Sequence, residues 1–279
     1  MFKYFKIFSL IGFIAVLATG CLFEEADEPV QQIEKLNLET DMEYIYRWVF
    51  SVDSGDGFKV VDAGRFALQV VDTNATFSGE DNLSVLKSTE VGSRGRNFTT
   101  TWYLKTDDEF TAVAFSRNGA NPNILPKNRS AGPDPTYLLF PRSLAFAAVN
   151  ANSADSVATK PPFTIQNADT TMRIEPRIVY EFPFLENKSW VSFEEPFLQT
   201  RKIDERRFTT VEAGTFATFT VITNSDFFRN SFRWKDFVAE NGLIKREISF
   251  SIQPFDEENN PLPKRKTTEQ VELVEIRPL

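Results

Sequence analysis

The strongest constraint on the fold of this 279-residue chain is a period-two alternation of apolar and polar residues that begins at Met42. Successive side chains of a strand point to opposite faces, so this alternation predicts strands with one buried face. In the first such segment, one face carries Tyr44, Tyr46, Trp48, Phe50 and Val52. Further strands are predicted at Arg65–Asp72, Phe98–Lys105, Glu109–Ser116, Arg173–Phe182, Ser189–Phe193, Phe208–Val211, Thr215–Thr223, Leu243–Gln253 and Val271–Arg277. The chain is therefore expected to be mainly β, with few short helices.

A pattern of fourteen residues occurs twice, with a displacement of 150 residues. The first copy reads Phe58-x-x-Val61-Asp62-Ala63-Gly64-x-Phe66-Ala67-x-x-x-Val71, and the second reads Phe208-x-x-Val211-Glu212-Ala213-Gly214-x-Phe216-Ala217-x-x-x-Val221. Each copy predicts a strand, a tight turn at Ala-Gly and a second strand that opens with an inward Phe. Two related β units are expected, at 42–150 and 151–279, either as two domains or within one continuous sheet.

The N-terminus has the layout of a secretory signal peptide. Lys3 and Lys6 precede an apolar stretch that is too short for a stable transmembrane helix. The stretch ends in Leu17-Ala18-Thr19-Gly20-Cys21, which resembles the lipobox of bacterial lipoproteins. The resemblance implies that residues 1–20 are a signal peptide and that the Cys21 thiol receives diacylglycerol. Cys21 is the only Cys of the chain, which favours lipoprotein processing over an ordinary cleavage site beside a chance Cys.

Residues 21–41 are expected to form a lipidated acidic tether. Two or three acyl chains anchor a protein stably, whereas one holds it only marginally, so the membrane is an expected partner through Cys21. Leu22 stands where an inner-membrane retention signal often has Asp, which by the family rule favours the outer membrane. The acidic run Glu24–Glu28 has two open interpretations, a solvated spacer repelled from anionic lipids or a signal for surface export like that of some Bacteroidota lipoproteins. The expected location is thus the periplasmic face or the cell surface.

The second unit carries an ordered set of motifs: Phe182-Pro183-Phe184, Lys188-Ser189-Trp190, Ala213-Gly214-Thr215-Phe216, Trp234 and Gly242-Leu243-Ile244-Lys245-Arg246-Glu247. This order resembles a class of uncharacterised bacterial lipoproteins, in which a Gly commonly precedes the first Trp and a Pro stands at the position of Glu212. The resemblance covers about 70 residues. It implies antiparallel curved sheets, half-barrel-like as in lipoprotein carriers, and no established activity. The structural motif residues it marks are Trp190, Ala213, Gly214, Phe216, Trp234 and Gly242, with Ala63, Gly64 and Phe66 as counterparts in the first unit.

Composition removes several kinds of chemistry. The chain has no His, which excludes His-based catalysis and His metal sites, and its one Cys excludes disulfides and Cys-held metal centres. The formal charge of −8 argues against nucleic-acid binding, which needs a basic surface. Removing residues 1–20 takes away two Lys and no acid, so this charge becomes −10. No cofactor and no metal is expected. The segment Asp53–Gly57 is a hairpin turn or, less simply, a calcium loop without its full set of acids.

These observations predict a lipid-anchored envelope protein that acts as a non-enzymatic binding or structural module, with an envelope protein or an apolar ligand as partner. One alternative is a carrier of acyl chains, suggested by the 28 Phe of the chain and by the aromatic cluster Phe227, Phe228, Phe232, Trp234 and Phe237. Another is a carboxylate-dependent hydrolase. Its candidate acids are Asp107-Asp108-Glu109, Glu194-Glu195, Asp204-Glu205 and Asp256-Glu257-Glu258.

Overall fold

The computed structural model describes residues 32–53, 55–77, 79–92, 95–118, 172–194, 198–226, 232–253, 256, 258 and 260–279. Its packed unit begins at Ile33 and ends at Leu279. The expected signal peptide, Cys21, the acidic run and the proposed unit boundary at 150/151 lie outside the described residues.

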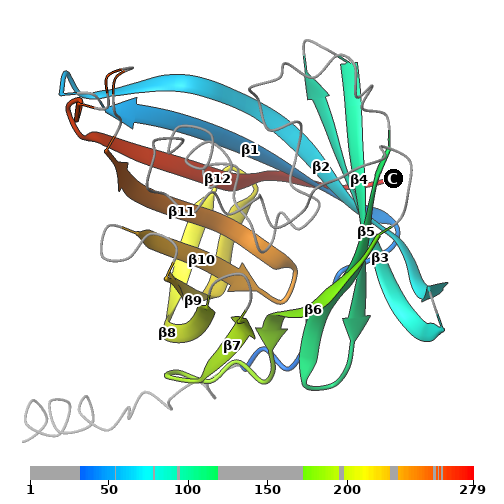
Figure 1. The fold of residues 1–279 in the computed structure, drawn as a ribbon. Helices are drawn as coiled ribbons and strands as arrows, with labels where there is room; N and C mark the ends of the chain where they lie inside the picture. The colour runs from blue at the N-terminus through cyan, green and yellow to red at the C-terminus, as the bar shows by residue number, and fades with distance from the viewer. Residues whose placement is uncertain are drawn as a thin grey trace, which may run out of the picture. The chain divides into compact units, whose positions relative to one another are not determined.

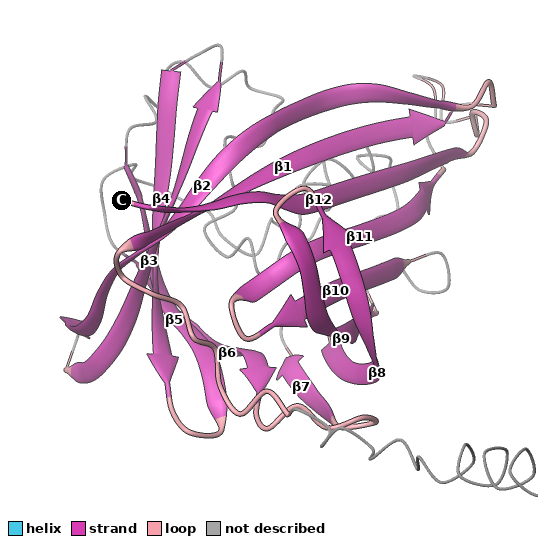
Figure 2. Cartoon of the chain, turned by 180° about the vertical axis from the view of Figure 1, so that it is seen from behind, coloured by secondary structure: helices cyan, strands magenta, loops and turns pink. Residues whose placement is uncertain are grey.

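Twelve strands make up the described part of the chain, which contains no helix (Figures 1 and 2). They are β1 (Met42–Asp53), β2 (Phe58–Phe77), β3 (Glu80–Gly92), β4 (Gly95–Lys105), β5 (Glu109–Asn118), β6 (Met172–Glu181), β7 (Ser189–Phe193), β8 (Gln199–Val211), β9 (Gly214–Ser225), β10 (Arg233–Ala239), β11 (Gly242–Ile252) and β12 (Arg265–Pro278). All lie in one antiparallel sheet that curves into a nearly closed, barrel-like arrangement. The predicted fold class, mainly β with antiparallel curved sheet, is confirmed.

The strand order divides the sheet into two meanders of six strands. The order across the sheet is β6-β5-β4-β3-β2-β1-β12-β11-β10-β9-β8-β7, so each strand pairs with its sequence neighbours except at the centre. There the first strand pairs with the last along its whole length, from Met42 opposite Pro278 to Asp53 opposite Lys266. The two halves of the chain are thus joined in the middle of one continuous sheet.

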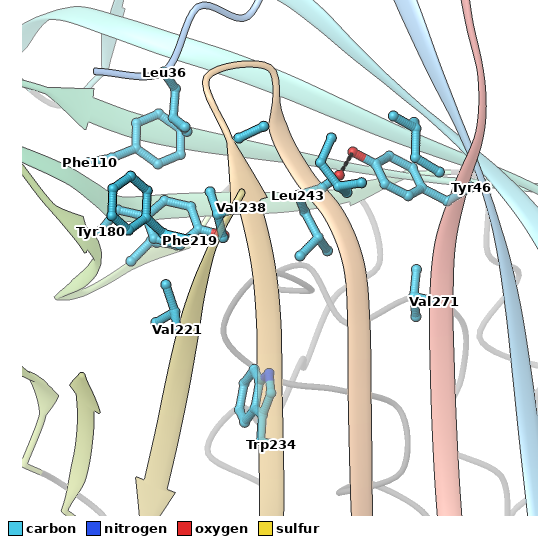
Figure 3. Packing of buried hydrophobic residues seen from close by; sticks show 14 of the residues in the cluster. Leu36, Tyr46, Phe110, Tyr180, Phe219, Val221, Trp234, Val238, Leu243 and Val271 are labelled. Atoms are coloured by element: carbon cyan, nitrogen blue, oxygen red, sulfur yellow. Dashed lines mark hydrogen bonds between the residues drawn. The ribbon is translucent and has the colours of Figure 1, made fainter. Parts of the chain in front are cut away.

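The predicted alternation of β1 places its large side chains in the core. Tyr44, Tyr46, Trp48 and Phe50 are all buried. Tyr46 stacks on Phe66 of β2 with ring centroids 4.9 Å apart, and its hydroxyl donates a 2.8 Å hydrogen bond to the Leu243 carbonyl of β11 (Figure 3). This bond satisfies the one polar atom of a fully buried ring, as a buried Tyr requires.

The two ends of the sheet, β6 and β7, come together through side chains. Ser192 Oγ donates to the Ile178 carbonyl at 2.6 Å, and Arg201 Nη1 donates to the Val179 carbonyl at 3.0 Å. Both carbonyls belong to β6, whose outer edge has no β7 ladder in the strand pairing. The seam of the barrel-like sheet is therefore closed by side-chain donors that take the place of backbone N–H groups.

The end of the expected tether is part of the packed unit. Ile33 and Leu36 are 3% and 2% exposed and belong to the core. The Ile33 carbonyl accepts from Phe184 N, and the Leu36 carbonyl accepts from Lys105 Nζ at 2.8 Å. Figure 3 shows Leu36 beside Phe110 of β5. Of the residues 21–41 assigned to a tether, those from Ile33 onward thus pack against the sheet.

Candidate functional site

A cluster of charged and aromatic side chains is fully buried on the inward face of β8, β10 and β11. Its members are Arg201, Trp234, Asp236 and Arg246, each at most 1% exposed. Strand alternation places them there, because Trp234 and Asp236 share the face of the core residue Val238. Asp236 lies directly opposite Arg246, and Trp234 and Arg201 both lie opposite Thr223 of β9.

Asp236 is the acceptor at the centre of this cluster. Its Oδ1 accepts from Arg246 Nε at 2.6 Å, its Oδ2 accepts from Arg246 Nη2 at 2.8 Å, and Trp234 Nε1 donates to Oδ1 at 2.7 Å. The fork geometry of Arg and carboxylate is the strong form of a charge-assisted hydrogen bond. Three donors therefore compensate the cost of removing the Asp236 charge from water.

The Trp234 indole packs against both guanidinium groups. The Cζ atoms of Arg246 and Arg201 lie 4.8 Å and 5.1 Å from the ring centroid, within the range of a cation–π interaction. Arg201 is also 5.8 Å from the Tyr180 ring and 4.0 Å from Asp236 Oδ2. Trp234 thus separates two positive charges that share one carboxylate.

Burial sets the electrostatics of the cluster. Desolvation lowers the pKa of Arg201 from its ordinary value, while the nearby Asp236 carboxylate acts in the opposite direction. Desolvation also raises the pKa of the Tyr180 hydroxyl above its usual range. Two further charged residues, Glu269 on β12 and Arg177 on β6, are buried as well. Five Arg, Asp and Glu side chains of the described sheet therefore lie in its interior, where unpaired charge is costly.

The charged groups of this cluster can hold neighbouring strands together through ion pairs and hydrogen bonds. Asp236 already accepts three donors, and a guanidinium group does not give up its proton at physiological pH. The Asp236–Arg246 pair ties β10 to β11, and Arg201 ties β8 to the seam strand β6. The cluster therefore fixes the position of three strands and the closure of the barrel-like sheet.

The predicted motif residues Phe66, Trp190, Trp234 and Gly242 are either core side chains or a glycine at a turn. Trp190 and Trp234 are core residues, and Phe66 is buried against Tyr46. Gly242 opens β11 with φ +100°, a conformation that favours glycine, and a Cβ there lies 3.2 Å from Leu38 Cδ2. These positions explain why a Trp or a Gly stands there, and they contain no catalytic group.

The two copies of the Ala-Gly repeat differ in structure. Ala213 and Gly214 lie at the turn between β8 and β9, with Gly214 at φ +138°, as the hairpin hypothesis predicts. Ala63 and Gly64, in contrast, lie inside β2 opposite Val49 and Trp48, so the turn predicted there is wrong. Gly64 serves a different purpose, because a Cβ at this position lies 3.0–3.1 Å from the Trp48 indole.

In the second copy, the turn at Glu212 and Ala213 contacts both β1 and β12. Ala213 N donates to the Leu273 carbonyl of β12 at 3.4 Å, and Arg47 Nη1 of β1 donates to Glu212 Oε2 at 3.2 Å. Phe216 is partly buried against the core. The turn thus rests on the two central strands of the sheet.

The described residues of the suspected aromatic cluster are core residues. Phe232, Trp234 and Phe237 are 6%, 1% and 5% exposed, whereas Phe227 and Phe228 lie outside the described residues. Phe182, Phe184 and Phe219 also pack ring to ring, with centroids 5.3 Å and 5.8 Å apart. The members that the structure places therefore form part of the core.

The acidic candidates that the structure describes are exposed except Glu109, which is half-buried and accepts a 3.2 Å hydrogen bond from Thr111 Oγ1. Asp107, Asp108, Glu194, Asp204, Glu205, Asp256 and Glu258 are all exposed. Asp53 holds a turn, with Oδ1 accepting from Gly55 N at 2.8 Å and Gly57 N at 3.1 Å. No group of three or more His, Cys, Asp or Glu side chains able to hold a metal ion occurs among the described residues. Within the same part of the chain, no helix is long and apolar enough to cross a membrane.

Sequence reasoning missed the buried ionic residues, although a signal for them exists. Arg246 alternates with Ile244, Ile248 and Phe250, all buried, and Glu269 alternates with Val271 and Leu273. A charge at an inward position of such an alternation predicts a buried, paired side chain. The identity of the partner depends on strand order, which local patterning does not contain.

No family model matches the chain, and no curated protein matches it in sequence. Among solved structures, a candidate exported protein with a YmcC-like fold from Bacteroides fragilis is 8% identical, with 87% of this chain and 98% of the other covered and a TM-score of 0.36. A candidate lipoprotein from Parabacteroides distasonis is 12% identical, with 83% of this chain and 94% of the other covered and a TM-score of 0.27. Because both TM-scores are below 0.5, neither similarity carries an argument about this chain.

Proposed function

We propose that this chain is a lipid-anchored protein of the bacterial envelope, held in the outer membrane by Cys21, whose β-sheet acts as a non-enzymatic binding or structural module. The observation that carries the proposal is the sequence Leu17-Ala18-Thr19-Gly20-Cys21 after a short apolar segment, with the only Cys of the chain at the position that lipidation requires. Two or three acyl chains on this residue supply a stable anchor.

The start of the packed unit supports an anchored geometry. Twelve residue steps separate Cys21 from Ile33, a reach of about 40 Å when fully extended. From Ile33 onward the chain is fixed by its bonds to Phe184 and Lys105 and by Asn37 N donating to the Glu240 carbonyl at 2.7 Å. The chain therefore enters the packed unit at the end of the sheet formed by the β4–β5, β6–β7 and β10–β11 connections.

A structural role is supported by the way charge is used in the described residues. The buried acid Asp236 is bound by two Arg and a Trp, and the described acidic candidates for hydrolysis are exposed except for the half-buried Glu109. The acyl-carrier alternative has less support, because Arg201, Arg246, Asp236 and Glu269 interrupt the apolar lining of the interior. Mass spectrometry of purified protein tests this ranking, since co-purified lipid in stoichiometric amount favours the carrier.

Metabolic labelling with palmitate tests the anchor. The wild-type protein is expected to incorporate label and to fractionate with the outer membrane, whereas Cys21→Ala loses the label and the membrane association. Leu22→Ala is the matched control, because it changes the adjacent residue and leaves the thiol in place. Labelling of Cys21→Ala at the wild-type level contradicts the proposal. Trypsin treatment of intact cells then separates the two faces, since a surface protein is digested and a periplasmic one is protected.

A further inference from the structure

The first part of β2 forms a free edge of the described sheet. β2 pairs with β1 from Phe58 to Gln69, but its pairing with β3 begins only at Phe66. Both views show β2 as the outermost strand where β1, β2 and β12 project beyond the barrel (Figures 1 and 2). Among the described strands, none lies beside residues 58–65 on the side away from β1, so no described strand pairs with their outward N–H and C=O groups. Within this edge, Ala63 N donates to Asp62 Oδ1 at 3.0 Å.

The side chains of this edge are apolar and exposed. Phe58, Val60 and Val61 are 48%, 64% and 55% exposed. Proteins usually protect such edges with charge, a bulge or a covering segment, because an apolar edge is a template for another strand. A bulge is present, since the register with β1 shifts at Val61. Three exposed apolar side chains within four residues are otherwise suited to the addition of a strand.

The sequence of the edge is complementary to itself in the antiparallel direction. Lys59 lies opposite Val52 of β1 and Asp62 lies opposite Phe50, so Lys59 and Asp62 point to the same face of the sheet. A twofold axis between Val60 and Val61 places Lys59 of each copy opposite Asp62 of the other. The same axis places Val60 of each copy opposite Val61 of the other. It also places Phe58 of each copy opposite Ala63 of the other, and within one chain these two residues point to the same face because their partners on β1 are Asp53 and Val49.

We propose that this edge pairs antiparallel with the same edge of a second copy of the chain, giving a dimer through β2. The pairing forms two identical Lys59–Asp62 contacts and buries the valines, whereas parallel in-register pairing places Lys opposite Lys and Asp opposite Asp. Within one chain Lys59 is weakly held, with Nζ 3.9 Å from Asp56 Oδ2 and both side chains exposed. This inference is independent of the lipid anchor and of the function proposed above.

Charge reversal tests the register. The full mature protein is purified in detergent, and its protein mass is measured by light scattering over a concentration series. Lys59→Asp and Asp62→Lys each convert two attractions into two repulsions and are expected to weaken the dimer by about tenfold or more. The double variant Lys59→Asp/Asp62→Lys restores both contacts and is expected to return to within about threefold of wild type. Lys202→Asp, an exposed position on β8, is the matched control with no effect.

Cross-linking tests the same contact by geometry. Opposed strands with this axis bring the two copies of residue 61 within disulfide range, so Val61→Cys is expected to form a disulfide-linked dimer on oxidation. Val71→Cys, which is equally exposed on the same strand at 56%, is the control that stays monomeric. A wild-type protein that is monomeric up to about 100 µM, a double reversal that does not restore the dimer, or cross-linking of Val61→Cys to a different protein overturns the proposal.

Discussion

Replacement of Asp236 by Asn tests the reasoning about the buried cluster. The substitution keeps the size of the side chain and removes its charge, so Arg246 and Arg201 lose the carboxylate they share. The change is internal to the sheet and touches no described surface group. It should therefore destabilise the whole fold and leave its surface chemistry intact.

The magnitude follows from what remains unpaired. Arg246 loses two charge-assisted bonds of 2.6 Å and 2.8 Å while staying fully buried. Removing one partner of a buried ion pair costs about 3–5 kcal/mol, because the other charge stays desolvated. The upper part of this range is expected for Asp236→Asn, since a second buried guanidinium lies 4.0 Å from the same carboxylate. The double variant Asp236→Asn/Arg246→Met removes the stranded charge and should recover part of the loss.

Urea unfolding followed by far-ultraviolet circular dichroism measures these differences. Glu205→Gln is the control, because the Glu205–Arg207 pair is exposed and such pairs contribute about 0–1 kcal/mol. A loss of less than about 1 kcal/mol in Asp236→Asn would refute the view that this carboxylate compensates two buried cations. A double variant less stable than the single one would refute the idea that the stranded Arg246 charge is the main cost.

Two further predictions concern the central strands. Gly64→Ala should destabilise by about 1–3 kcal/mol through overpacking, because its Cβ meets the buried Trp48 indole at 3.0–3.1 Å; the exposed neighbour Ala63→Ser should be neutral in the same thermal melts. Burial raises the pKa of Tyr46 above its usual range, so the native state keeps a proton that the unfolded chain loses near pH 10. The free energy of unfolding should thus be constant below about pH 9 and fall above about pH 10, by up to about 1.4 kcal/mol per pH unit for this group. Tyr46→Phe should show a shallower fall in urea titrations between pH 7 and 11, and an unchanged slope would contradict the assignment.

Local patterning predicted most of the strands, but it missed β3 and β10, began β8 nine residues too late, and left the strand order open. The aromatic alternation of Tyr44 to Phe50 predicts β1 and its buried face, which the structure confirms. Pairing between β1 and β12 joins residues more than 200 positions apart, and no local period records such a contact. The same limit explains the error at Gly64, where Ala-Gly suits a turn but lies opposite Trp48 inside a long strand.

The candidate site was the least predictable part of the molecule. The family-like motif includes Trp234 and Arg246, yet their relation to Asp236 and Arg201 depends on three strands meeting on one curved face. Asp236 follows Lys235 in a segment whose charges resemble those of a solvated strand end. The burial that distinguishes Asp236 from its neighbour comes from strand alternation combined with sheet curvature.

The central pairing of β1 with β12 determines when the protein can fold. Hairpins within each meander involve neighbouring strands and can form early, because short loops close with little loss of entropy. The two meanders, however, have no shared ladder among the described strands until residues 265–278 reach β1. When the chain emerges N-terminus first, the sheet therefore stays incomplete until the fourteen residues of β12 are available. The continuous sheet is thus completed late, when β12 pairs with β1, even where the hairpins of the first meander have already formed.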